Sequence, residues 1–181
     1  MAETIKARPR REREGFFEKY LVGHGIDIGC SDDPVTDECD CWDIALGNRD
    51  ATFMEGVNDE TYDFAYSSHT LEHLDRPDLA VQNWMRILMP RGFLILFIPH
   101  RTYYEKRRTL PSTWNHDHRT FWLPDRYEPP CTIGLIPFLV QHLGDTFAFV
   151  YCKVCCGGNT ITDPAIHSDG EYSIECVIQK R

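Results

Sequence analysis

The sequence predicts an α/β protein with a doubly wound, mostly parallel sheet and an antiparallel hairpin at its C-terminal end. Short apolar runs typical of buried strands alternate with an amphipathic helical segment between residues 25 and 99, which indicates a parallel sheet. Polar residues gather directly after the runs Ile26–Ile28 and Tyr62–Ser67, where open α/β sheets bind ligands. Farther on, Thr146–Cys155 and Tyr172–Gln179 are strand-like and are separated by a stretch rich in Gly, Asn, Asp and Pro. This pattern predicts a long-looped hairpin at the sheet edge.

The N-terminal part is predicted to be a basic arm followed by a helix. Arg11–Val22 has an apolar stripe at helical spacing, and the glycines after Val22 end it. The arm, Lys6–Glu14, is interpreted as a solvated, partly frayed lead-in to that helix, with an anion-binding arm as the less favoured alternative. Three strands are predicted next, the third very short: Ile26–Ile28, Cys39–Ile44 and Thr52–Met54.

A helix over Pro77–Leu88 separates the predicted strands Tyr62–Ser67 and Phe93–Ile98. Asp75 is its predicted cap, since a carboxylate can accept from the first free amides of a helix, and proline suits the first turn. A second helix is predicted over Ile133–Leu143. Residues 101–130 follow neither period, and a loop of this length in a compact domain is usually functional. We interpret them as a substrate-side segment or lid.

Length and composition restrict the class of protein. The 181 residues predict one domain over residues 1–181, with residues 1–22 as its N-terminal arm and helix. A net charge of −9 argues against a broad nucleic-acid surface. No apolar run reaches transmembrane length and the N-terminus is charged, so a cytoplasmic protein without a membrane partner is expected. Its eight cysteines should then be mostly reduced thiols.

Three motifs resemble those of a class I S-adenosylmethionine-dependent methyltransferase of the small methyltransferase type 11 kind. They are GIDIGC from Gly25, YDFAYSSHTLEHL from Tyr62 and RILMPRG from Arg86. They occur in the family's order at fitting spacing, and the resemblance extends from about Gly25 to His100. It implies a Rossmann-like methyltransferase fold and an enzyme that uses S-adenosylmethionine.

The resemblance also implies a cofactor site. Asp27 would organise the glycine turn and receive the cofactor's ammonium, directly or through water, and Gly29 would let the backbone approach the ligand. Ser31 stands where the family has a second glycine, a departure that affects the methionine end. Asp43 is the best match for the acid that holds the ribose hydroxyls. The full predicted set is Asp27, Gly29, Cys30, Ser31, Asp43, Asp50, Ala51, Ser68 and His69.

Two parts of this assignment carry alternatives. Asp50 and Ala51 resemble the turn that faces the adenine ring, but the short spacing from Asp43 means that the third strand is truncated or displaced. A surface carboxylate is an equal alternative for Asp50. After the next strand, His69 is interpreted as cofactor-facing, with a structural histidine as the alternative. Glu72 is interpreted as structural, although Glu72 and His73 could also cap the following helix or face the substrate.

The segment after residue 99 carries the predicted substrate side. Three histidines, an acid and an arginine near one opening could deprotonate a hydroxyl or amine and hold an anionic group. The alternative is a surface segment whose aromatic residues pack a lid. Predicted catalytic residues, as the base or its orienting groups, are His116, Asp117 and His118, and predicted substrate-binding residues are His100, Arg101, Tyr104, Trp114, Asn115 and Arg119.

No metal is predicted. Zinc bound by Cys39, Cys41 and the cysteines at 152, 155 and 156 is a minority hypothesis, because side chains alternate along strands and no CxxC pair has knuckle spacing. A metal bound by Asn115–His118 is weaker still, because adjacent residues on one loop rarely converge on an ion without further ligands.

The function predicted from these features is methyl transfer to an oxygen or nitrogen of a small polar acceptor, such as a sugar or a nucleotide-linked molecule. One alternative is a catalytically silent module or partner subunit that keeps the fold. Another is an RNA or protein methyltransferase that uses the basic arm, which the acidic net charge disfavours.

Overall fold

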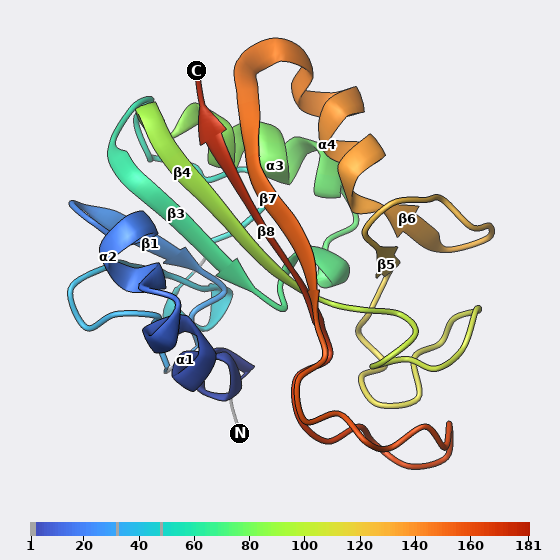
Figure 1. The fold of residues 1–181 in the computed structure, drawn as a ribbon. Helices are drawn as coiled ribbons and strands as arrows, with labels where there is room; N and C mark the ends of the chain where they lie inside the picture. Colours follow the sequence, from blue (N-terminus) through green and yellow to red (C-terminus); the bar gives the residue numbers. More distant parts are fainter. Residues whose placement is uncertain (1–2, 32, 48) are drawn as a thin grey trace.

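The computed structural model describes residues 3–31, 33–47 and 49–181, and its centre is a six-stranded sheet of order β2-β1-β3-β4-β8-β7 (Figure 1). Strands β2, β1, β3 and β4 run parallel, whereas β8 is antiparallel to both β4 and β7. The predicted fold class and the C-terminal hairpin are therefore confirmed. The strands are β1 (Gly25–Ile28), β2 (Asp40–Trp42), β3 (Tyr62–Ser68), β4 (Leu88–Pro99), β7 (Phe147–Cys155) and β8 (Ser173–Lys180).

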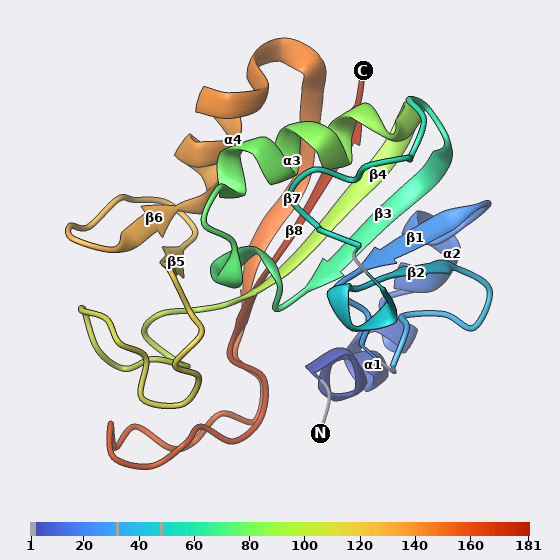
Figure 2. The same ribbon diagram turned by 180° about the vertical axis from the view of Figure 1, so that it is seen from behind.

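Helices cover both faces of the sheet, as a doubly wound fold requires. Helices α3 (Pro77–Arg86) and α4 (Leu135–Leu143) lie on one face, and α1 (Glu3–Arg13) and α2 (Phe16–Tyr20) lie on the other (Figures 1 and 2). The larger apolar core lies under α3 and α4 and includes the fully buried Trp84. Burial of such apolar side chains from both faces explains why the central strands read as continuous hydrophobic runs.

The N-terminal basic segment is a docked helix, so its interpretation as a solvated, frayed arm is wrong. Helix α1 extends over most of the run, and Arg11 within it is completely buried. Its Nε donates to Glu175 Oε2 at 2.7 Å, and its guanidinium lies 4.5 Å from the ring centroid of Phe97. The predicted single helix over 11–22 is also divided, because Gly15 adopts φ 62° between α1 and α2.

The interval between β2 and β3 contains no third strand among the described residues. Thr52–Met54 forms a turn instead of the predicted strand. A short 3-10 helix, η1 (Ile44–Leu46), follows β2, and β2 is the edge of the sheet. The sequence indicated a truncated or displaced third strand, whereas among the described residues between β2 and β3 that strand is missing.

Helix α3 begins without its predicted cap. Arg76 precedes it and makes no capping hydrogen bond, while Asp75 is exposed. Arg76 instead pairs with Asp78 at 2.7 Å, and Trp84 Nε1 donates to the Ala51 carbonyl at 2.8 Å. After α3, strand β4 begins at Leu88, earlier than predicted, because Tyr62 of β3 pairs with Leu88 across an irregularity in the register.

The segment after β4 contains a second, two-stranded sheet. Strands β5 (Phe121–Leu123) and β6 (Thr132–Gly134) are parallel to each other, and pairing in β6 delays the start of α4 to Leu135. Residues 101–120 form no helix or strand, which agrees with their lack of sequence period. Among the described residues, no helix has the length and apolarity needed to cross a membrane.

The cysteines are mostly unpaired. Cys30, two residues after β1, forms a disulfide with Cys41 in the neighbouring strand β2, and six other cysteines are free. Six free cysteines out of eight agree with the expectation of mostly reduced thiols, and the disulfide is the exception. Within the described residues, no three cysteines bring their sulfur atoms together as a metal site.

Candidate functional site

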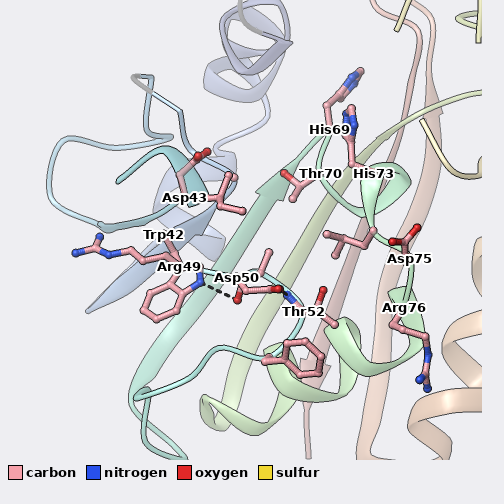
Figure 3. Close-up of a pocket in the computed structure, with 15 residues that line it drawn as sticks. Trp42, Asp43, Arg49, Asp50, Thr52, His69, Thr70, His73, Asp75 and Arg76 are labelled. Carbon is pink, nitrogen blue, oxygen red and sulfur yellow. Dashed lines mark hydrogen bonds between the residues drawn. The ribbon is translucent and has the colours of Figure 1, made fainter. Parts of the chain in front are cut away.

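A pocket of about 650 Å³ lies at the carboxyl ends of β1, β2 and β3 (Figure 3). This volume is within the usual range for small-molecule sites, and the position is where α/β sheets bind their ligands. The pocket therefore occupies the place that the sequence pattern predicted. Its lining residues come from four segments: Gly29; Trp42, Asp43 and Ile44; Arg49, Asp50, Ala51, Thr52 and Phe53; and His69, Thr70, His73, Leu74, Asp75 and Arg76.

Gly29 brings two of these segments into contact. It has φ 82°, and a Cβ there would lie 1.9 Å from Thr70 Oγ1. The Thr70 hydroxyl donates to the Ile28 carbonyl at 3.1 Å, and the Gly29 amide donates to the Trp42 carbonyl at 2.8 Å. A glycine is thus required at this position because the loop after β3 approaches it closely. These contacts join the ends of β1, β2 and β3.

Asp43 is held in a fixed orientation at the end of β2. Its Oδ1 accepts from the Ala45 amide at 2.9 Å, and its Oδ2 accepts from the Ser31 amide at 3.0 Å. An ionised carboxylate has about four acceptor positions. Asp43 therefore keeps free acceptor capacity on each oxygen while its own conformation is fixed.

The turn at Asp50 and Ala51 is anchored by two tryptophans. Trp42 Nε1 donates to the Asp50 carbonyl at 3.1 Å, and Trp84 Nε1 donates to that of Ala51. Asp50 Oδ1 accepts from the Thr52 amide at 2.6 Å. Beside this turn, Phe53 presents a half-exposed aromatic ring to the pocket.

His69 lines the pocket from the loop after β3 and adopts φ 51°. Its Nε2 lies 2.9 Å from Ser173 Oγ of β8. Burial, followed by the nearby charges of His118 and Lys6, holds the pKa of His69 well below its usual value. The ring is therefore neutral at physiological pH.

The structure brings five of the nine predicted cofactor residues to the pocket lining: Gly29, Asp43, Asp50, Ala51 and His69. The other four, Asp27, Cys30, Ser31 and Ser68, do not line it. Asp27 is buried, accepts from the Val35 amide at 2.7 Å and has a pKa that burial raises to about 7. Its carboxyl group organises the loop after β1, and a direct contact with the cofactor stays a prediction.

The predicted catalytic residues do not face one site. His116 and Asp117 are exposed, whereas His118 is buried with its Nδ1 2.5 Å from Glu105 Oε1. His73, which the sequence left as a helix cap or a substrate-facing residue and not among the candidate site residues, lines the pocket. Its position four residues after His69, just beyond a strand end, was the available signal.

Most predicted substrate-binding residues have internal partners. Arg101 Nη1 donates to Glu128 Oε2 at 2.7 Å, and His100 Nδ1 accepts from the Thr102 amide at 3.1 Å. Tyr104 stacks on His118 with ring centroids 5.5 Å apart. The remaining three are Trp114, which packs on His167; Asn115, which accepts from the Asp117 amide; and Arg119, which is exposed.

Comparisons with known proteins agree with this geometry. Residues 26–96 match a family described as a methyltransferase domain. No curated protein sequence matches the chain significantly.

Solved structures share the fold at low identity. A SAM-dependent methyltransferase from Archaeoglobus fulgidus is 15% identical, with a TM-score of 0.57 over 98% of this chain and 94% of that chain. A SAM-dependent methyltransferase from Thermotoga maritima, described as a possible histamine N-methyltransferase, is 19% identical, with a TM-score of 0.56 over 100% of both chains. A structure from work on the conversion of a disulfide bond into a thioacetal group during echinomycin biosynthesis is 13% identical, with a TM-score of 0.62 over 96% and 80%.

The domain match over residues 26–96, the fold and the position of the pocket make this chain similar to class I S-adenosylmethionine-dependent methyltransferases. The matched residues extend from β1 into β4 and include every residue of the pocket lining. S-adenosylmethionine is the cofactor that this similarity implies.

The residues present fit the adenosyl part of that cofactor. Asp43 has free acceptor positions for two ribose hydroxyls, and Phe53 and Leu74 offer apolar surface for an adenine ring. Asp50 and Ala51 would face the same ring from their anchored turn.

Proposed function

We propose that the chain transfers the methyl group of S-adenosylmethionine to an oxygen or nitrogen of a small polar acceptor, such as a sugar or a nucleotide-linked molecule. The observation that carries this proposal is the pocket beside Asp43, His69 and His73, together with a basic cavity after β4. When bound, the cofactor would supply an electrophilic methyl group on its sulfonium. The main contribution of the protein to such a transfer is to hold the acceptor in line with that methyl group.

The basic cavity supports an acceptor with an anionic group. It has a volume of about 450 Å³ and follows β4 at the carboxyl edge of the sheet. Guanidinium groups bind phosphate and carboxylate through paired hydrogen bonds. Arg101 and Arg126 already pair with Glu128, so the positive charge available to an anion comes from Lys106, Arg107 and Arg108, for which no ion pair is found among the described residues. Its lining residues are Arg101, Thr102, Lys106, Arg107, Arg108, Arg126, Thr162 and Pro164.

The alternative of an RNA methyltransferase is less well supported, because two arginines of the basic segment are already engaged. Arg10 pairs with Glu171 and Glu175, and Arg11 pairs with Glu175 inside the protein. These guanidinium groups are unavailable to phosphates, so the segment offers a weaker electrostatic footprint than its sequence suggests.

Calorimetric titration with S-adenosylmethionine and S-adenosylhomocysteine tests the cofactor site. We expect the wild type to bind both, and Asp43→Ala to bind at least about tenfold more weakly, the loss of roughly one charged hydrogen-bonding group. Asp145→Ala is the matched control, because this exposed carboxylate precedes β7 at the opposite edge of the sheet. No heat from the wild type would refute the proposal and favour a silent module.

A transfer assay with labelled methyl groups and a panel of small polar acceptors tests the acceptor class. Turnover with a phosphorylated sugar or nucleotide-linked acceptor, reduced in Arg108→Ala, would agree with an anion site after β4. Turnover only with RNA, falling steeply as salt is raised, would contradict the small-acceptor proposal.

A further inference from the structure

A cluster of Glu72, His73 and His118 lies beside the pocket and has the composition of a metal site. One ligand atom of each residue lies within 4.8 Å of those of the other two. His118 Nε2 is 3.7 Å and His73 Nε2 is 3.8 Å from Glu72 Oε1. Two ligands of one tetrahedral zinc ion are about 3.3–3.6 Å apart when each bond is about 2.0–2.2 Å. The cluster therefore needs only small side-chain movements to surround one ion.

Glu72 at the centre of this cluster has no hydrogen-bond partner among the described residues, although its side chain is completely buried. Both carboxylate oxygens are in this state. The imidazole nitrogens near Oε1, including Nδ1 of His69 at 3.8 Å, are too distant to donate to it. An isolated buried carboxylate is costly. Either binding a cation or taking up a proton removes that cost.

His118 is oriented by a second carboxylate. Its Nδ1 lies 2.5 Å from Glu105 Oε1, an arrangement in which the ring donates from Nδ1 and turns the lone pair of Nε2 toward Glu72. A carboxylate on the far nitrogen of a ligating histidine is a recurring feature of zinc sites. Glu105 is itself 2% exposed, so this support lies inside the protein.

The main chain fixes the distance between the two loops that supply the cluster. The amides of Arg119 and Thr120 donate to the Glu72 carbonyl at 2.8 and 3.2 Å. Tyr104 stacks on the His118 ring with the ring centroids 5.5 Å apart. The cluster is thus a built feature of the interior and does not depend on exposed loop tips.

We propose that Glu72, His73 and His118 bind one divalent transition-metal ion, with Glu105 as the positioning residue for His118. Two imidazoles and one carboxylate are a ligand set of zinc sites that keep an open position, and imidazole disfavours Mg²⁺. His73 lines the pocket, so an ion held by it would have its open position on the side of that pocket. If the proposed methyl transfer holds, an acceptor hydroxyl bound there would lose its proton more readily.

Metal binding is tested directly, without an activity assay. The whole chain is purified, stripped with a chelator and titrated with Zn²⁺ by calorimetry, and with Co²⁺ by visible absorption. We expect one Zn²⁺ per chain, and a Co²⁺ spectrum typical of four nitrogen and oxygen ligands. Mg²⁺ should give no heat. Because the readout is metal content, a failed methyltransferase assay would leave this result intact, and the reverse also holds.

Variants locate the ion. Glu72→Gln and His118→Asn should each abolish stoichiometric Zn²⁺ binding, and Glu105→Gln should weaken it about 10–100-fold, as outer-shell substitutions do. His116→Asn is the matched control, since this histidine is exposed on the same loop and outside the cluster, and it should bind Zn²⁺ as tightly as the wild type.

Several results would overturn the proposal. No Zn²⁺ binding by the wild type means that Glu72 is kept neutral by a proton instead. A thiolate-to-cobalt absorption band, or full binding by Glu72→Gln, would assign the ion to cysteines. If a variant does not fold, the wild type still decides, because Zn²⁺ should raise the melting temperature of the stripped protein and Mg²⁺ should not.

Discussion

Replacing Arg11 by methionine tests whether the buried ion pair between α1 and β8 holds the N-terminal helix on the sheet. Arg11 donates to Glu175 at 2.7 Å and to the Tyr66 hydroxyl at 2.8 Å, and methionine keeps the apolar stem but removes both bonds. Removing one partner of a buried pair costs about 3–5 kcal/mol. Because Arg10 and Tyr151 still bond to Glu175, we expect a loss near the lower end, about 3 kcal/mol.

The pH dependence gives an independent check on that magnitude. Burial alone would raise the pKa of Glu175, but its hydrogen bond to Arg10 and the charges of Arg11 and Arg10 lower it from 4.5 to about 2. This difference corresponds to about 3 kcal/mol of stabilisation. Since the folded pKa lies below the unfolded one, the contribution is complete above about pH 5 and is lost as the pH falls toward 2.

Urea unfolding of wild type, Arg11→Met and Arg13→Met between pH 3 and 8 measures both effects. Arg13, the exposed last residue of α1, is the control and should change the free energy of unfolding by no more than about 0.5 kcal/mol. A loss below about 1 kcal/mol in Arg11→Met would show that the pair does not hold the helix. An acid-side slope unchanged from the wild type would lead to the same conclusion.

Three further substitutions test the strand ends around the pocket. Asp27→Asn keeps an acceptor for the Val35 amide and removes a carboxyl group whose pKa burial raises from 3.8 to about 7. In urea unfolding, this variant should therefore be more stable than the wild type at pH 8 and equally stable near pH 4. Cys41→Ser should lower the free energy of unfolding by about 3 kcal/mol without reductant, as expected for a disulfide that closes a short loop. Cys39→Ser removes a free thiol and should lower it less. Equal losses in the two variants would argue against the disulfide. Gly29→Ala should lower the melting temperature more than Gly47→Ala. Both glycines have positive φ, but of the two only Gly29 has a neighbour with which the new methyl group would collide. Equal melting temperatures would contradict that reasoning.

The parts of the fold that the sequence predicts are those determined by local pattern. The apolar runs of β1, β3 and β4 and the hairpin of β7 and β8 carry their own periodicity and turn residues. The burial of Arg11 has no such local signal. Its partner Glu175 is 164 residues away, and a basic run in a sequence normally indicates a solvated surface.

The candidate site likewise contains residues whose position the sequence predicts and residues whose position it does not. Gly29 and Asp43 follow predicted strands, and neighbouring parallel strands bring their ends to one edge, so their position in the pocket is foreseeable. The contact between Glu72 and His118 is not, because His118 belongs to a segment without helical or strand period. Hydrogen bonds from the Arg119 and Thr120 amides to the Glu72 carbonyl bring it there, and Glu105 and Tyr104 hold its ring.

The order of the strands has a consequence for how the polypeptide folds as it is made. Strand β8 lies between β4 and β7, although it is synthesised after both. Until residues 173–180 leave the ribosome, the apolar strand β4 keeps one unpaired edge, which is a ready template for pairing with another chain. Nascent chains that stop before residue 173 should therefore aggregate, and a chaperone that shields β4 would have to release it to β8 for the sheet to close.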